Sequence, residues 1–352
     1  MKKLRLIMNV VFALAVTGVF AQANQNFNLQ QGSENGAEVL QVGTTNFNSS
    51  YQTWHNNWTN ISQIGTSNVA VEIQNGANNY AEVNQIGTEN NSLQLQTGFN
   101  NGAEANQEGF RNHSDQYQNG AFNYGETNQD GLFNAAYQVQ EGIANSAVAS
   151  QEGFLNYSDQ YQNGALNYGE TNQDGSFNAA YQVQEGIGNN AVATQSGTSN
   201  NSMQNQQGNW NNANANQDGT ANESDQQQDG NGNYAGATQN GTSNDNLQLQ
   251  LGWGNNAAAS QFGIRNDNNQ FQDGGNNYAE ANQTGFENLN NQTQLGNGNG
   301  AVANQWGMHN VNNTLQFGNG NGANIGQFGT ANNHFGVQIG SGNWISTTQI
   351  GW

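Results

Sequence analysis

The sequence predicts an all-β protein that folds as a β-solenoid of about 15 two-strand rungs, and three observations support this prediction. Gln recurs every eleven residues at 30 consecutive positions, from Gln30 to Gln349. Gly stands two residues after each of these Gln residues, with the single exception of Trp54, and Asn stands five residues after each but the last. The chain contains no Pro, as expected where almost every backbone N–H is paired in a sheet.

Each eleven-residue unit predicts one strand followed by one turn. The side chains of a strand alternate between its two faces, so in the segment 101–107 we expect the residues at odd positions to face inward. Residues 108–111 are expected to form the turn, where Gly109 takes a backbone conformation that other residues resist.

Alternate units differ, so the full repeat is 22 residues long. The third inward residue is small in one class, as at Ala105 and Ala149, and is Gln in the other, as at Gln116 and Gln138. Small residues opposite large ones can fill a narrow interior. Two strands joined by a turn make one rung, and rungs stacked ~4.8 Å apart give a rod of roughly 70 Å.

The interior is mostly polar, and buried amides are costly unless they are hydrogen-bonded. A stack of equivalent rungs meets this requirement, because each Gln or Asn side chain can bond its copy one rung along. We call such a column of repeated side chains, with its turn glycines, a ladder. It is expected to include Gln63, Gly65, Asn68, Gln74, Gly76, Asn79, Gln85, Gly87, Asn90, Gln96, Asn101, Gln107, Asn112, Gln118, Asn123 and Gln129.

Composition excludes several classes of protein. Only 33% of the chain is hydrophobic and 9% charged, which would suit a disordered chain if the polar residues were not so strictly periodic. A right-handed helical coil also has an eleven-residue period, but it needs an apolar seam and few glycines. The absence of Cys excludes disulfides and thiolate metal sites.

The N-terminus has the features of a secretory signal peptide, predicted over residues 1–23. A basic start at Lys2, Lys3 and Arg5 is followed by an apolar segment and then by Ala21-Gln22-Ala23, where cleavage after either Ala is open. The apolar segment is shorter than the ~20 residues of a membrane span, and no later segment is apolar enough. We therefore expect a secreted chain whose repeat domain covers residues 24–352 and has no membrane span.

Cleavage would remove those three cations, and the net charge would fall from −20 to about −23. Nothing in such a chain neutralises phosphates, so we expect no nucleic-acid partner. The four His residues occupy different repeat positions, and no catalytic, cofactor or metal site is expected. Glu82, Glu104 and Glu126 share an outward column, which we interpret as a solvated acidic stripe with weak divalent-cation binding as the alternative.

One outward face of the rod is predicted to be apolar. It carries Leu93, Leu95, Tyr137, Val139, Tyr181, Val183, Leu247 and Leu249, while the opposite face is acidic and rich in amides. We expect the apolar face to serve lateral bundling or adhesion, against the alternative of ordinary scattered surface residues.

The two ends of the repeat array are also more apolar than its middle. The residue after the ladder Gln is apolar at Val42, Ile64 and Ile86 and again at Phe317, Phe328, Ile339 and Ile350. Unpaired end rungs are exposed strand edges, and we expect copies of the chain to stack head to tail through them.

The unit Q-x-G-x-x-N-x-[A/S/G/N]-x-x-x-Q resembles the curlin repeat. Residues 74–85 and 140–151 fit that pattern without a gap, and the resemblance covers residues 24–352. It implies a non-enzymatic subunit of a curli-type amyloid fibre in the biofilm matrix, with itself and curli-type outer-membrane export and nucleation proteins as partners. The chain departs from the family in having about three times as many repeats, and Gln in the second inward column.

Two other functions stay open, a curli nucleator or minor subunit and a non-polymerising cell-surface adhesin. An ice-binding solenoid would need a flat array of Thr, and a polysaccharide-cleaving solenoid would need a cleft with placed acids. Neither pattern is evident in the sequence.

Overall fold

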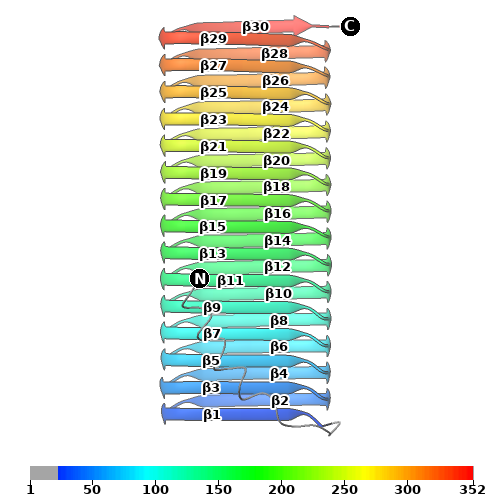
Figure 1. Cartoon of the computed structure of the whole chain (residues 1–352), viewed down its shortest axis with the longest axis vertical. Coiled ribbons are helices and arrows are strands. Elements are labelled where there is room, and N and C mark those ends of the chain that lie inside the picture. Colours follow the sequence, from blue (N-terminus) through cyan, green and yellow to red (C-terminus); the bar gives the residue numbers. More distant parts are fainter. Residues whose placement is uncertain (1–22, 352) are drawn as a thin grey trace, which may run out of the picture.

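The computed structural model describes residues 23–351, so the predicted signal peptide lies outside the described residues except for Ala23. Over this range the chain forms thirty strands in two parallel fifteen-stranded sheets (Figure 1). No helix in the described range is long and apolar enough to cross a membrane.

The odd-numbered strands form one sheet, called sheet A: β1 (Gln25–Ser33), β3 (Phe47–His55), β5 (Val69–Ala77), β7 (Asn91–Phe99), β9 (His113–Ala121), β11 (Ala135–Ile143), β13 (Tyr157–Ala165), β15 (Ala179–Ile187), β17 (Asn201–Asn209), β19 (Glu223–Asn231), β21 (Asp245–Trp253), β23 (Asp267–Gly275), β25 (Leu289–Asn297), β27 (Val311–Asn319) and β29 (Asn333–Ser341).

The even-numbered strands form the other sheet, called sheet B: β2 (Gly36–Thr44), β4 (Trp58–Thr66), β6 (Tyr80–Thr88), β8 (Gly102–Phe110), β10 (Tyr124–Leu132), β12 (Ser146–Phe154), β14 (Tyr168–Ser176), β16 (Asn190–Thr198), β18 (Asn212–Thr220), β20 (Tyr234–Thr242), β22 (Asn256–Ile264), β24 (Tyr278–Phe286), β26 (Gly300–Met308), β28 (Gly322–Thr330) and β30 (Trp344–Ile350).

The chain alternates between the sheets, so each odd strand and the even strand after it make one rung. Neighbours within a sheet are offset by 22 residues without a slip, as where Gln107 pairs with Gln85 on one side and Gln129 on the other. The predicted β-solenoid of about 15 rungs is therefore confirmed.

The core lies between the sheets and is built from alternate side chains. In β8, Ala103, Ala105 and Gln107 are buried while the residues between them are partly exposed. Across the interior, Gln116 and Gln138 are also buried, so small side chains do lie opposite large ones. The result is a polar Asn and Gln core with a column of alanines.

The boundaries predicted for strand and turn were wrong by several residues. Strand β8 runs over Gly102–Phe110, so most of the expected turn belongs to the strand. Gly109 keeps its register with Gly131 despite a φ of 116°. The bend comes at Arg111, which takes the left-handed conformation with a φ of 55° just before Asn112.

The turn glycine is required by the close approach of successive rungs. A Cβ at Gly109 would lie 2.0 Å from the Gly131 carbonyl oxygen. No side chain fits at that distance, and the φ of 116° is one that L-residues rarely adopt. Trp54 is the exception in this column, with a φ of 78° and a side chain that is 67% exposed.

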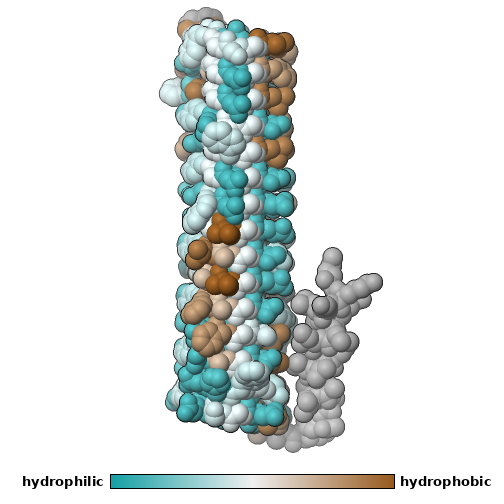
Figure 2. Space-filling model, turned by 90° about the vertical axis from the view of Figure 1, so that its left-hand side faces the viewer, coloured by the Kyte–Doolittle hydropathy of each residue, from teal (hydrophilic) through white to brown (hydrophobic). Residues whose placement is uncertain are grey.

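The rod has two narrow edges where the turns lie. Figure 2 shows the edge at which the odd-numbered strands end, with an apolar patch on its lower half. Exposed residues on this edge include Phe99, Phe122, Ile143, Leu166 and Ile187. On the other edge, aromatic rings meet edge to face along successive rungs, at 5.3 Å for Phe110 with Phe133, 6.0 Å for Phe133 with Phe154 and 5.3 Å for Phe154 with Phe177.

Replacing the turn glycine should open the rod locally. We expect Gly109→Ala to destabilise the surrounding rungs by at least about 2 kcal/mol, because the backbone strain at this φ and the loss of backbone hydrogen bonds between rungs add together. The measurement is amide hydrogen exchange in β6, β8 and β10.

The matched control is Gly232→Asn, at the bend position where a Cβ would meet nothing within 4 Å. Asn78 and Asn100 already occupy equivalent bends, so the cost should stay below about 1 kcal/mol. Equal protection in the Gly109→Ala variant and the unsubstituted chain would contradict the close-approach argument.

Candidate functional site

A Gln ladder runs along the inner side of each sheet. In sheet B, Gln63 Nε2 donates to Gln85 Oε1 over 2.9 Å, and Gln85 Nε2 donates to Gln107 Oε1 over 2.8 Å. The same Nε2 of Gln85 also donates across the interior to the Val69 carbonyl oxygen at 2.8 Å. Each such amide uses both N–H donors and its acceptor, which offsets the cost of burying it.

An Asn ladder closes the turns and runs in the opposite direction. The Asn112 backbone N–H donates to Asn90 Oδ1 over 3.0 Å, one rung toward the N-terminus. Asn112 Nδ2 donates to the carbonyl oxygens of Glu108 at 2.8 Å and Gly131 at 3.0 Å. One side chain thus satisfies turn carbonyls of its own rung and of the next.

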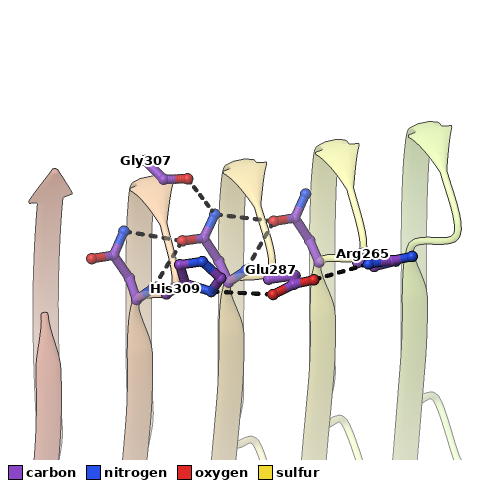
Figure 3. A network of polar contacts seen from close by, with 7 residues as sticks. Arg265, Glu287, Gly307 and His309 are labelled. Atoms are coloured by element: carbon purple, nitrogen blue, oxygen red, sulfur yellow. Dashed lines mark hydrogen bonds and ion pairs between the residues drawn. The ribbon is translucent and has the colours of Figure 1, made fainter. Parts of the chain in front are cut away.

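The same arrangement recurs near the C-terminus, where the Gly307 carbonyl accepts from Asn288 Nδ2 at 3.1 Å (Figure 3). Beside it, Glu287 contacts Arg265 at 3.1 Å and His309 at 3.2 Å, each from the bend of a neighbouring rung. Arg265 and His309 are exposed and Glu287 is about one-third exposed, so the ion pairs contribute little to stability.

The structure brings the ladder residues named from the sequence into these columns. The amides among them are all buried, namely Gln63, Asn68, Gln74, Asn79, Gln85, Asn90, Gln96, Asn101, Gln107, Asn112, Gln118, Asn123 and Gln129. The glycines Gly65, Gly76 and Gly87 all have a φ of 128°.

The outward face of sheet A contains two columns of different character. Leu93, Leu95, Tyr137, Val139, Tyr181, Val183, Leu247 and Leu249 all belong to this sheet. Tyr137 pairs with Asp115 and Asp159 in its column, so that column alternates between apolar and acidic residues from β7 to β15. Val139 instead pairs with Tyr117 and Tyr161, and this second column is apolar from β1 to β15.

Aromatic rings also stack on sheet A. The ring of Tyr157 lies 5.6 Å from that of Tyr137 and 5.3 Å from that of Tyr181, and Tyr137 lies 5.3 Å from His113. Neither this stack nor the two apolar edges is predicted from the sequence. The signal for the edges was present in the third and fourth residues after each Gln, which we had expected only to turn the chain.

Sheet B carries a polar triplet in several rungs. Tyr124 Oη donates to Glu126 Oε2 at 3.0 Å, and Asn128 Nδ2 donates to Glu126 Oε1 at 2.8 Å. The same hydrogen bonds join Tyr168, Glu170 and Asn172. Burial and the hydrogen bond to Glu126 raise the pKa of Tyr124.

The acidic stripe is less solvated than we expected. Glu82, Glu104 and Glu126 do pair in register, and the column ends at Val148. Burial, with the charges of Glu126 and Glu82, raises the pKa of Glu104, while Tyr124 acts in the opposite direction. Over residues 23–351, no group of three His, Cys, Asp or Glu side chains is placed to hold a metal ion.

The ladders stop at open ends with complementary groups. Gln30 and Gln41 donate to Gln52 and Gln63, and their Oε1 atoms accept no hydrogen bond from the described residues. At the other end, Gln338 and Gln349 accept from the rung below and donate only to backbone carbonyls within the described range.

The Asn ladder ends in the reverse sense. Asn24 Oδ1 accepts the Asn46 backbone N–H at 3.1 Å. At the C-terminal end the Asn343 N–H donates to Asn321 at 3.1 Å, and Asn343 Oδ1 accepts nothing from the described residues. One end of the rod therefore offers Gln acceptors and Asn donors, and the other end offers Gln donors and Asn acceptors.

Charge is distributed unevenly along the rod. All 25 acidic residues lie between Glu34 and Glu287, and residues 288–352 contain no Asp, Glu, Lys or Arg. The only ionisable side chains of the last three rungs are thus those of His309 and His334.

No family model and no curated protein matches the chain.

Removing the side-chain amide of one ladder Gln should reduce the free energy of unfolding much more than the same substitution at its exposed neighbour. Gln206 accepts from Gln184 at 2.9 Å and donates to Asn190 O and Gln228 Oε1 at 2.8 Å. Gln206→Met leaves three partners unsatisfied, and we expect a loss of roughly 3 kcal/mol.

The control is Gln207→Met, which lies next in sequence on the exposed side and should change stability by less than about 0.5 kcal/mol. Hydrogen exchange in β15, β17 and β19 measures both. If the two variants were equally protected, the ladder would not be the main source of local stability.

Proposed function

We propose that this chain is the secreted structural subunit of an extracellular, curli-like amyloid fibre that grows by end-to-end stacking of solenoids. The observation that carries the proposal is the complementarity of the two rod ends. Adding β1 and β2 of a second copy above β29 and β30 continues both sheets with the same 22-residue repeat.

In that arrangement each open group meets its partner. The free N–H of Gln338 would donate to Gln30 Oε1 of the next copy, as Gln316 donates to Gln338 at 2.8 Å within the chain. The Oδ1 of Asn343 would accept a backbone N–H from the same copy. Two identical ends offer the same groups to each other, so head-to-tail addition is favoured.

The charge distribution also supports head-to-tail addition. A chain of net charge −20, or about −23 after removal of the signal peptide, repels its copies, but the three rungs without Asp, Glu, Lys or Arg separate the C-terminal end from Glu287 by ~14 Å. This exceeds the Debye length of ~8 Å at physiological ionic strength. Exposed Val42, Ile64, Ile339 and Ile350 near the two ends add apolar surface to the junction.

Secretion and location follow from the sequence expectations. The predicted signal peptide directs export, and the curlin-type repeat implies outer-membrane export and nucleation proteins as partners. The chain itself is the main partner proposed, in a homopolymer at the cell surface within the biofilm matrix. The proposal includes no enzymatic activity.

A charge placed inside the C-terminal rung should stop growth while leaving the subunit folded. Ile345 faces inward at the end of the stack, where Lys can still reach solvent until another copy covers it. For Ile345→Lys we expect fibre elongation to be at least about tenfold slower, because stacking would bury the ammonium group. Elongation is measured by thioflavin-T fluorescence and electron microscopy.

The control is Trp344→Lys, which changes the adjacent outward residue and should elongate normally. Unsubstituted chain should give unbranched fibres with a cross-β reflection at about 4.7–4.8 Å. A stable β-rich monomer that forms no fibres over days would overturn the proposal and favour the adhesin or nucleator alternative.

A further inference from the structure

A carboxyl side chain lies inside the core, in a column otherwise built from neutral residues. Glu72 on β5 is fully buried, and its register partners are Ser50 on one side and Gln94 on the other. From Gln94 onward this column is a Gln ladder, with Gln94 donating to Gln116 at 3.0 Å and Gln116 donating to Gln138 at 3.1 Å.

The Gln ladder lacks a hydrogen-bond donor at the position of Glu72 when the side chain of Glu72 is a carboxylate. Elsewhere in the column each Gln Oε1 accepts from the Gln one rung toward the N-terminus. Gln94 Oε1 has Glu72 at that place and accepts no hydrogen bond from residues 23–351. Both carboxyl oxygens of Glu72 are also without a partner in this range. A carboxylate cannot donate, so the two side chains present only acceptors to each other.

The surroundings offer no charge to compensate for a carboxylate. The same rungs hold the buried apolar cluster of Ile61, Ala70 and Val83. Strand β5 pairs with β3 and β7, and hydrogen bonds across the interior join it to β4 and β6; none of these four strands carries Lys or Arg. Their ionisable groups are Tyr51 and His55 on β3 and Tyr80 and Glu82 on β6, all at outward positions.

We propose that Glu72 is a neutral carboxylic acid in the folded rod, donates its proton to Gln94 Oε1, and makes folding of the N-terminal rungs dependent on uptake of one proton. Protonation turns two facing acceptors into a donor and an acceptor, and so completes the ladder. Independently, burial raises the pKa of Glu72 well above its usual value. The nearby Thr59 hydroxyl, itself without a hydrogen-bond partner among the described residues, favours the carboxylate and lowers the pKa, while the charge of Glu82 adds to the rise.

The sign of the pH dependence follows from this rise. An unfolded Glu titrates near pH ~4.3, and the folded chain holds the proton to a higher pH. The stabilisation is therefore fully present below pH ~4.3 and is lost as pH rises toward the folded pKa, with the equilibrium for opening these rungs increasing about tenfold per pH unit. The effect is local, because each rung of a repeat protein contacts only its neighbours.

The test compares hydrogen-exchange protection factors at pH 5 and pH 8 in the whole chain, for β3–β7 and for the distant strands β20–β23. We expect protection of β3–β7 to fall at least tenfold between these pH values, with little change in β20–β23. Glu72→Gln supplies the missing donor permanently and should keep β3–β7 protected at both pH values.

Glu170→Gln is the matched control, since it makes the same change at an outward carboxyl and should keep the fall in β3–β7. The infrared carbonyl band of a neutral carboxylic acid should be present at pH 7 in the unsubstituted chain and absent in Glu72→Gln. Protection that is independent of pH, an equal fall in Glu72→Gln, or no such band in the unsubstituted chain would overturn the proposal. Both measurements apply to monomers and fibres alike, so their failure is distinct from failure of the proposed assembly.

Discussion

The need to satisfy every buried amide governs this structure. An interior of Asn and Gln is stable only if each donor and acceptor finds a partner, and the partners here are copies of the same residue one rung away. Gln85, for example, is bonded to Gln63 below, to Gln107 above and to the backbone across the interior. A single inserted residue would break this register in both sheets, which explains why the 22-residue spacing never slips over the described rod.

The outer surface is free of that constraint and varies accordingly. Outward positions contain the Tyr137 stack, the Tyr124–Glu126–Asn128 triplet and the apolar edges, none of which is repeated in every rung. The interior therefore determines the fold, while the outside is available for solubility, for contacts between rods and for the placement of charge away from the C-terminal rungs.

The architecture was predictable from the sequence because the ladder residues are strictly periodic. The inward columns, the pairing of Ala105 with a facing Gln column, and the number of rungs all followed from spacing. The bend did not, because the left-handed position is occupied by residues as different as Arg111, Leu155 and Phe177, so composition carries no signal there. The importance of Glu72 was missed for a different reason. A single carboxylate in a Gln column stands out only once its neighbours' unpaired oxygens are known.

The opposite directions of the two ladders have an electrostatic consequence. Gln side chains direct their N–H groups toward the C-terminal end and their oxygens toward the N-terminal end, whereas the Asn oxygens point the other way. The C=O dipoles of the two sets of amides therefore oppose each other along the axis, and parallel strands themselves contribute only a small net dipole. A rod built in this way can lengthen without the growing field that aligned amides produce in a long helix.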